Sequence, residues 1–237
     1  NKNRIWPYII DWEKVVSDTP EFFYEYNPYI PQDIAEIEEI MKDYILIDLE
    51  TTWFTKLCQI IQVGIGFFWE ANVWNEDYDK SKMLRKTEFF VAPYKDSINE
   101  EIFDITWIRQ EDIEEKGHNI EKVLDFLYKI LDGKVVAAHN AAFDYWKICE
   151  AFIDFRRKPP VPSKLIDTID LFKLINLKKK FGLWQFNLNR MAKAFLWEDI
   201  ENLDERHTAL FDVKVTHEAL KAATTATELA NKKKKWK

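Results

Sequence analysis

Residues 44–52 read Tyr-Ile-Leu-Ile-Asp-Leu-Glu-Thr-Thr. The apolar start of this run predicts a buried β-strand. Asp48 and Glu50 follow near its end, and residues two apart on a strand point to the same face of the sheet. Carboxylate oxygens at such an edge suit Mg²⁺ or Mn²⁺, although acidic residues at the end of a strand can also be simply solvated.

Apolar patterning on both sides of this strand predicts a mixed α/β fold. Continuous β-type runs predict further strands at 58–68, 87–92 and 135–138. Apolar residues at helical spacing predict helices at 34–41, 120–131, 140–155, 168–176, 183–195 and 208–230. A strand meander followed by alternating strands and helices indicates one sheet covered by helices.

A second polar segment, His139-Asn-Ala-Ala-Phe-Asp144, follows the predicted strand at 135–138. Asn140 is of a type that caps helices, and Asp144 then lies one turn inside the helix. An acidic residue in the first turn also interacts favourably with the helix dipole, so this segment alone is compatible with a structural or a functional role.

A third segment, His207-Thr-Ala-Leu-Phe-Asp212, opens the last predicted helix. Side chains five positions apart on a helix diverge by about 140°, so His207 and Asp212 do not face one site from a continuous helix. We therefore expect Thr208 to be the N-cap, His207 to lie just before the helix, and Asp212 to point inward from the first turn. A lone histidine at a helix start is otherwise an ordinary surface residue.

Taken in order, the three segments resemble the three motifs of the DEDDh exonucleases. Asp48-x-Glu50-Thr-Thr, His139-Asn-Ala-x-Phe-Asp144 and His207-x-Ala-x-x-Asp212 match those motifs, and the resemblance extends from about residue 43 to residue 222. This family includes the proofreading subunit of bacterial DNA polymerase III, RNase T and oligoribonuclease. The resemblance implies a ribonuclease H-like fold, a mixed five-stranded sheet flanked by helices, and 3′-5′ exonuclease activity.

The resemblance also implies a site. Asp48, Glu50, Asp144 and Asp212 are expected to hold two divalent ions, Mg or Mn, and His207 to take the proton from the attacking water. The expected contacts to a single-stranded 3′ end are Thr51, Thr52, Phe54, His139, Asn140 and Phe143. Phe54 and Phe143 are candidates to stack on the terminal bases, although both could equally belong to the core.

Composition divides the chain into three parts. Residues 1–42 are expected to form an acidic N-terminal extension, 43–230 the exonuclease domain and 231–237 a Lys-rich tail; residues 1–50 hold 12 Asp or Glu against 4 Lys or Arg. The extension either packs on its own domain or docks a partner, and a DNA polymerase is one possible partner.

Charge and cysteine content restrict the function classes. A net charge of −7 argues against a protein that coats nucleic acid through many basic contacts. Residues 156–180 nevertheless hold 8 basic and 2 acidic residues, which could line the path of a nucleic-acid strand or form a solvated face. Two separate cysteines in apolar segments and the lack of a long apolar run favour a cytoplasmic protein with no membrane partner.

Tryptophan stands where the family usually has glycine. Trp53, Trp107 and Trp197 occupy three such positions in a chain with 10 Trp and 5 Gly. One hypothesis is that the source organism reads the UGA codon as glycine while the sequence was translated with UGA as tryptophan; the alternative is true divergence. If the hypothesis holds, Trp53 places a bulky side chain beside the first motif of the protein as written.

Three functions stay open at this stage. The first is a DNA exonuclease of the proofreading or repair type, and the second is an exoribonuclease that trims RNA or degrades oligoribonucleotides. The third is a non-catalytic module that binds a nucleic-acid end or a polymerase, for which loss of a catalytic residue is the expected signature. Oligomeric state does not follow from the sequence.

Overall fold

The computed structural model describes residues 27–52, 58–69, 85–94, 106, 108–200 and 208–227. These residues contain a five-stranded sheet in the order β3-β2-β1-β4-β5. Its strands are β1 (Asp43–Thr51), β2 (Ile60–Trp69), β3 (Arg85–Phe90), β4 (Val135–Ala138) and β5 (Lys164–Asp167). The first three strands pair antiparallel, whereas β4 and β5 run parallel to β1. The predicted mixed five-stranded sheet is therefore confirmed.

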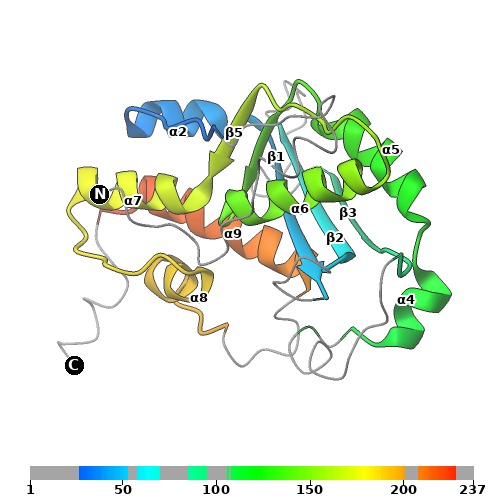
Figure 1. The fold of residues 1–237 in the computed structure, drawn as a ribbon. Helices are drawn as coiled ribbons and strands as arrows, with labels where there is room; N and C mark the ends of the chain where they lie inside the picture. Colours follow the sequence, from blue (N-terminus) through cyan, green and yellow to red (C-terminus); the bar gives the residue numbers. More distant parts are fainter. Residues whose placement is uncertain are drawn as a thin grey trace, which may run out of the picture.

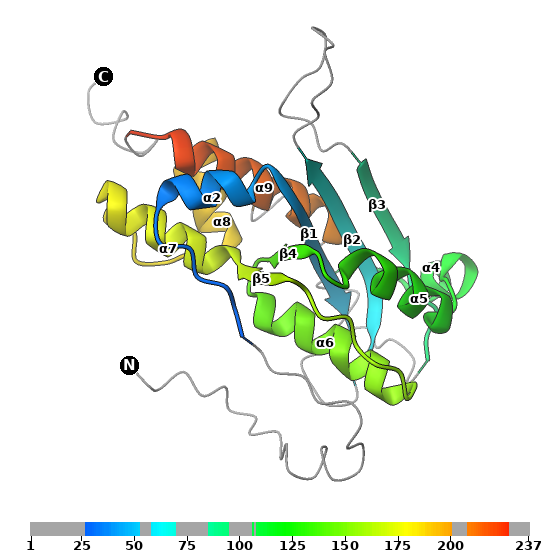
Figure 2. The same cartoon turned by 90° about the horizontal axis from the view of Figure 1, so that it is seen from above.

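Helices cover both faces of this sheet (Figures 1 and 2). They are α2 (Ile34–Ile40), α4 (Gln110–Lys116), α5 (Ile120–Leu131), α6 (Ala141–Asp154), α7 (Thr168–Lys179), α8 (Leu188–Met191), the π-helix η1 (Ala192–Leu196) and α9 (Ala209–Thr225). None of the described helices is both long and apolar enough to cross a lipid bilayer.

The two faces carry separate cores. On one face, Ile45, Ile47 and Leu49 of β1 pack with α5 and α6. On the other face, Tyr44 and Leu46 pack with α2, α7 and α9. We call the second face the site face. Alternation along β1 thus sends successive apolar residues into different cores.

A buried aromatic cluster joins α9 to the sheet on the site face. The Tyr44 hydroxyl and His217 Nδ1 lie 2.6 Å apart, and the His217 ring stacks on Phe68 with ring centroids 3.8 Å apart. Burial lowers the pKa of His217 to about 4, so the imidazole is neutral at physiological pH. The cluster fixes the middle of α9 against β1 and β2.

The described part of the predicted N-terminal extension lies against the sheet and α7. The backbone amide of Tyr29 donates to the carbonyl of Leu165 in β5 at 2.6 Å. Ile37 and Ile40 of α2 are buried in the core of the site face. The Asp33 side chain accepts a hydrogen bond from the amide of Glu36 at 2.9 Å and caps α2.

The helix predicted at 183–195 is wrong over its first half. Residues 181–187 are not helical, and helix starts only at Leu188. The Asn176 side chain accepts from the Leu183 amide at 2.8 Å and donates to the Leu183 carbonyl at 3.0 Å. Because these bonds replace helical ones, Leu183 stays non-helical beside α7, and Asn187 then caps α8 through the Arg190 amide.

Three further elements differ from expectation. The last helix ends at Thr225 rather than at residue 230. Strand β5 and helix α4 were not predicted. Between Lys164 and Asp167, β5 has only two apolar residues, and α4 buries only Ile113. Short elements of this kind carry too few apolar residues for a period to be visible.

Candidate active site

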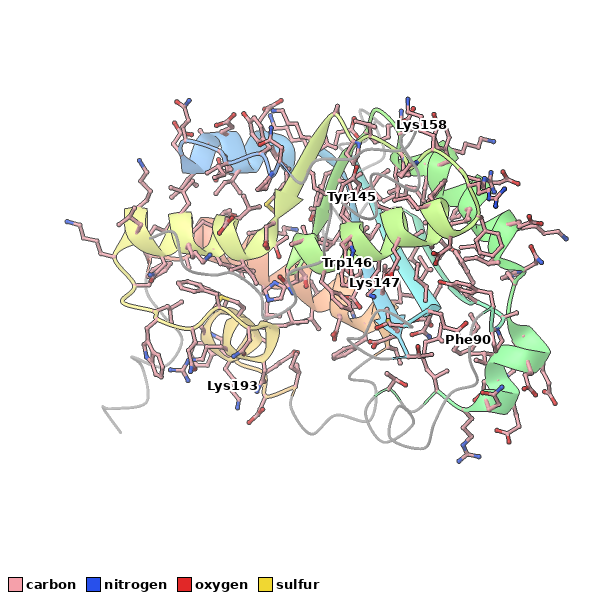
Figure 3. The ribbon with its side chains drawn as sticks, in the orientation of Figure 1. Phe90, Tyr145, Trp146, Lys147, Lys158 and Lys193 are labelled. Carbon is pink, nitrogen blue, oxygen red and sulfur yellow. The ribbon has the colours of Figure 1, made fainter. Side chains whose placement is uncertain are left out.

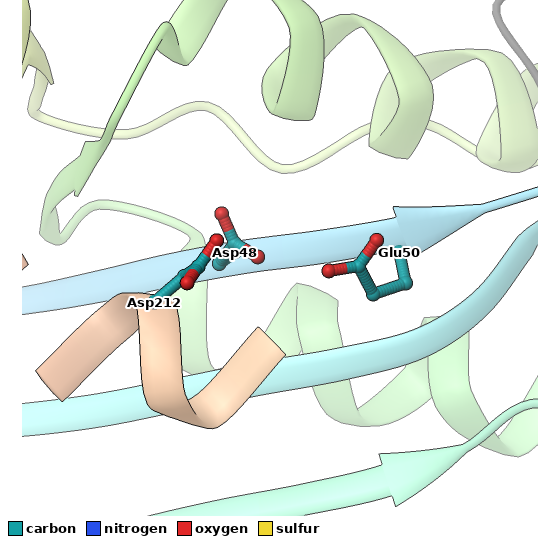
Figure 4. Close-up of side chains that lie close together, drawn as sticks. All are labelled: Asp48, Glu50 and Asp212. Carbon is teal, nitrogen blue, oxygen red and sulfur yellow. The ribbon is translucent and has the colours of Figure 1, made fainter. Parts of the chain in front are cut away.

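Three carboxylates come together on the site face (Figure 4). Asp48 and Glu50 of β1 and Asp212 of α9 each offer one oxygen, and these oxygens all lie within 4.8 Å of one another. Among the described residues, this is the set of His, Cys, Asp and Glu side chains that is close enough to hold a metal ion. The structure therefore brings together the first and third sequence motifs.

Strand alternation explains where Asp48 and Glu50 lie. They continue the row of Tyr44 and Leu46, so they project from the site face. The apolar cover of that face ends where they begin, and both are only partly buried. The same strand therefore supplies core in its first half and carboxylates in its second half.

Asp144 of α6 is not one of the three carboxylates that lie within 4.8 Å of one another, but its charge acts on Asp48 and Glu50. The β1–β4 ladder pairs Ile45 with Val136 and Leu46 with Ala137, and no pair is formed beyond these. The Leu49 amide, further along β1, donates to Asp144 Oδ1 at 3.1 Å instead. Burial raises the pKa of Asp144 to about 8 even though this hydrogen bond lowers it. Asp144 thus has a fixed place at the point where the two strands separate.

The carboxylates repel one another. Burial raises the pKa of Asp48 well above its usual range, and Asp144, Asp212 and Glu50 raise it further. The pKa of Glu50 is raised in the same way, first by burial and then by Asp212, Asp144 and Glu88. The charges that act on Asp48 and Glu50 are thus those of other carboxylates.

The donor set fits a divalent cation. Oxygen ligands from several carboxylates are what Mg²⁺ and Mn²⁺ prefer. A cation would also relieve the mutual repulsion that raises the pKa of Asp48 and Glu50. The acidic cluster therefore indicates use of a divalent metal.

The third motif has the predicted arrangement as far as the structure describes it. Helix α9 begins at Ala209 with Thr208 as N-cap, and Asp212 lies in its first turn. The Thr208 side chain makes no capping hydrogen bond. His207 lies outside the described residues.

The side chains expected to touch substrate around the first motif are partly described. Thr51 ends β1, and Thr52 follows it. The Thr52 hydroxyl accepts from the Gln59 amide at 3.0 Å, and the Thr52 amide donates to the Gln59 carbonyl at 3.0 Å. Thr52 thus closes the base of the loop between β1 and β2. Phe54 lies outside the described residues.

The second motif connects β4 to the start of α7 and to the end of β5. His139 Nδ1 lies 2.9 Å from the hydroxyl of Thr168 on α7, and burial lowers the pKa of His139 to about 4. Asn140 is the N-cap residue of α6, as predicted, with a φ of 74° in the left-handed region, but its side chain makes no capping hydrogen bond. Its backbone amide donates to Asp167 Oδ1 at 3.1 Å instead. Phe143 is partly buried in the first turn of α6.

The basic segment 156–180 does not gather at the site. The carboxyl end of β5 lies beside Asn140. Residues 156–163 precede β5 and therefore lie at the opposite, amino-terminal end of the parallel strands, where Figure 3 labels Lys158. Arg157 pairs with Asp125, and Lys173 pairs with Asp170 at 2.6 Å. Lys179 donates to the carbonyls of Thr224, in the last turn of α9, and of Ala226, which follows the helix. These partners favour the solvated-face interpretation.

The sequence did not reveal three residues of β2 and β3 that contact the start of α9. Gln62 and Glu88 accept its first backbone amides, and Gly64 lies directly beneath it. A polar residue and a glycine inside the otherwise apolar run of β2 were the available signal, since glycine inside a strand often marks a close backbone approach.

Structural comparison defines the fold class. The zinc-bound complex of Escherichia coli ExoI with single-stranded DNA superimposes with a TM-score of 0.61 and 16% identity, over 78% of this chain and 41% of that chain. The nuclease domain of 3′hExo, a DEDDh family member bound to rAMP, gives 0.57 and 16%, over 80% and 95%. The fold is ribonuclease H-like, as predicted.

Sequence comparison gives the family. The RNase T model, described as exonuclease, matches residues 45–220, and the chain belongs to this exonuclease family. The chain is 30% identical over 156 residues to the 3′-5′ exonuclease DinG of Staphylococcus saprophyticus, over 64% of this chain and 15% of that protein. It is 27% identical over 136 residues to the PolC-type DNA polymerase III of Mycoplasmopsis pulmonis, over 57% and 9%. The predicted enzyme class, a 3′-5′ exonuclease, is confirmed, and the match spans only a small part of these relatives.

Of the three tryptophans at family glycine positions, Trp197 lies within the described residues. It follows η1 with a φ of 67° and is 58% exposed. A left-handed residue directly after a helix is most often glycine, and a bulky side chain is strained there. The backbone at 197 is thus that of a glycine position, which fits the UGA hypothesis. Trp53 and Trp107 lie outside the described residues.

Proposed function

We propose that this chain hydrolyses phosphodiester bonds at single-stranded or frayed 3′ ends of DNA, with two divalent ions, Mg or Mn. The single observation that carries the proposal is the convergence of Asp48, Glu50 and Asp212 within 4.8 Å, inside a chain of the exonuclease family. Asp144 adds a fourth carboxylate from a different element.

Asp48, Glu50, Asp144 and Asp212 would hold the ions. Bound ions supply activation of the attacking water and stabilisation of charge on the phosphate and the leaving oxygen. The protein's own contribution is to fix the positions of these carboxylates, through the end of β1, the Leu49 amide and the first turn of α9.

His207 is proposed as the general base, because an imidazole titrates near neutral pH and this one precedes the N-cap of α9 in sequence. His139 of the second motif and His217 of α9 are unsuited to this role: burial lowers the pKa of each to about 4, which makes it a weak base, and each is engaged by a hydroxyl. Thr51, Thr52, Phe54, His139, Asn140 and Phe143 are proposed to line the path of the terminal nucleotides.

DNA is proposed as the substrate because the chain resembles a 3′-5′ exonuclease DinG and a PolC-type DNA polymerase, and because E. coli ExoI was solved with single-stranded DNA. A role in DNA proofreading or repair, with a polymerase as partner, is the finer form of the proposal. An RNA substrate is the second candidate, favoured by the likeness to the 3′hExo nuclease domain, which was solved with rAMP.

The test is a timed digestion of single-stranded DNA and RNA of the same sequence, labelled at the 3′ or the 5′ end. We expect the 3′ label to be released first as mononucleotide, with Mg²⁺ or Mn²⁺ and not with EDTA, and DNA to be degraded faster than RNA. Faster degradation of RNA would favour the second candidate. Release of the 5′ label first, or no cleavage with any ion, would overturn the proposal.

A matched control identifies the source of any cleavage. Asp48→Asn keeps the size of the side chain and removes a carboxylate of the cluster. Cleavage by this variant at the wild-type rate would indicate a contaminating nuclease rather than this site.

A further inference from the structure

The start of α9 rests directly on the central strands of the site face. Gly64 of β2 lies beneath it, and a Cβ at this position would lie 2.3 Å from the carbonyl carbon of Ala209 and 2.5 Å from the amide nitrogen of Leu210. Such distances are far inside van der Waals contact, so only glycine allows this approach.

The first amides of α9 are bound from outside the helix. The first four N–H groups of a helix lack partners within it, and the N-cap side chain usually accepts one of them. Thr208 does not. Gln62 Oε1 of β2 accepts from the Ala209 amide at 3.0 Å, and Glu88 Oε1 of β3 accepts from the Leu210 amide at 2.9 Å.

The sheet register places these two acceptors beside the carboxylates. Asp48 pairs with Gly64, and Gly64 pairs with Glu88, so these three lie in one row across β1, β2 and β3. Glu50 pairs with Gln62 in the neighbouring row. Paired residues share a face, so the two acceptors and the two β1 carboxylates project from the same face.

We propose that Gln62 and Glu88 are positioning residues that fix the first turn of α9, and with it Asp212, over Asp48 and Glu50. This inference rests on the proposed function for its effect on the reaction. Acceptors on two strands thus bind amides that the Thr208 side chain does not cap. The distance between Asp212 and the β1 carboxylates is then set by the sheet rather than by the loop before the helix.

Substitutions of Glu88 can separate the effect of its hydrogen bond from the effect of its charge. Its side chain is exposed, so a substitution there does not open a cavity. Glu88→Gln keeps the acceptor oxygen and removes the charge that raises the pKa of Glu50, whereas Glu88→Leu removes both. Gln62→Leu removes the second acceptor at similar size, and Lys86→Leu is the matched control, two residues back on the same strand and on the same face.

The experiment measures hydrogen exchange at the amides of Ala209 and Leu210, together with kcat and KM on a single-stranded oligonucleotide. We expect Glu88→Leu and Gln62→Leu to exchange faster at these amides and to lower kcat roughly tenfold with little change in KM, because small displacements of catalytic groups are costly. Glu88→Gln and Lys86→Leu should retain the wild-type exchange and kcat.

Two results would overturn the inference. One is wild-type exchange and kcat in Glu88→Leu. The other is an equal loss of kcat in Glu88→Gln and Glu88→Leu, which would assign the effect to charge. If the wild-type chain cleaves no substrate, the proposed function fails, and the amide exchange still decides whether Gln62 and Glu88 anchor the helix.

Discussion

The two faces of the sheet use the same strand differently. On the face covered by α5 and α6, β1 contributes Ile45, Ile47 and Leu49 to one continuous core. On the site face, the row that starts with Tyr44 and Leu46 continues as Asp48 and Glu50. One face is therefore built for stability along its whole length. The other gives up apolar burial and accepts mutual repulsion where the carboxylates gather.

The largest expected effect is that of Asp48→Asn, which should lower activity and raise stability. Asp48→Asn should lower the cleavage rate by about a thousandfold or more, as is usual when one member of a catalytic unit is lost. It should also raise Tm in EDTA, because one of several repelling carboxylates is removed. Single-turnover cleavage and thermal unfolding of the same preparation measure both changes.

Ile47→Ala is the control from the opposite face. Ile47 is 1% exposed, and its truncation should destabilise the protein by about 2–5 kcal/mol while leaving the rate per folded molecule unchanged. His207→Ala is the control within the site: it should abolish turnover yet leave metal binding intact. A stability loss in Asp48→Asn, or a loss of metal affinity in His207→Ala, would contradict the division of roles.

The pH dependence of stability should also come from the site face. Asp48, Glu50 and Asp144 have raised pKa values in the folded state, that of Asp144 reaching about 8, so the folded state binds more protons than the unfolded state. These carboxylates should then lower the stability of the metal-free protein as the pH rises from about 4, the pKa of a free carboxyl, towards 8. His139 and His217, whose pKa values are lowered to about 4, oppose this trend below about pH 6.5.

Divalent ions should reverse this trend, since they bind the ionised carboxylates. The rise in Tm on adding Mg²⁺ should therefore be larger at pH 8 than at pH 5, by an amount measurable in a domain for which about 1 kcal/mol corresponds to roughly 2–4 °C. Scanning calorimetry at the two pH values, with Mg²⁺ and with EDTA, provides the comparison. Equal shifts at both pH values would show that these carboxylates do not titrate in this window.

The sequence was sufficient for the parts that repeat or alternate. The apolar run at 44–49 predicted β1, and its alternation predicted the common face of Asp48 and Glu50. The sequence was insufficient where a side chain distant along the chain replaces a local hydrogen bond. The Asn176 side chain binds the Leu183 amide and prevents a helix there, and Gln62 caps a helix that begins 147 residues later. Such contacts have no period in the chain, and only the folded sheet brings the partners together.

The smallest expected effect concerns the segment that covers the site face. Leu196 of η1 packs beneath α9, and Trp197 follows with a strained left-handed backbone. Trp197→Gly should stabilise the protein by about 0.5–1 kcal/mol. The backbone strain that it removes from the folded state is larger than the conformational entropy that glycine adds to the unfolded state. Urea unfolding measures the difference.

Trp184→Gly is the matched control. Trp184 is 73% exposed and is not among the described residues with positive φ, so glycine there should be neutral or destabilising. Destabilisation by Trp197→Gly would argue that tryptophan is the native residue at 197. The coding DNA gives an independent answer, since UGG codons at 53, 107 and 197 would end the hypothesis of reassigned UGA.

The hydrogen bond from the Ala209 amide to Gln62 also has a consequence for timing during synthesis. Its two partners are 147 residues apart, and those of the contact between Tyr44 and His217 are 173 apart. A ribosome therefore completes the whole sheet before α9 can dock and deliver Asp212. A nascent or truncated chain that lacks α9 has only Asp48 and Glu50 of the three clustered carboxylates, so the potential to degrade nearby nucleic acid arises only when the fold is nearly complete.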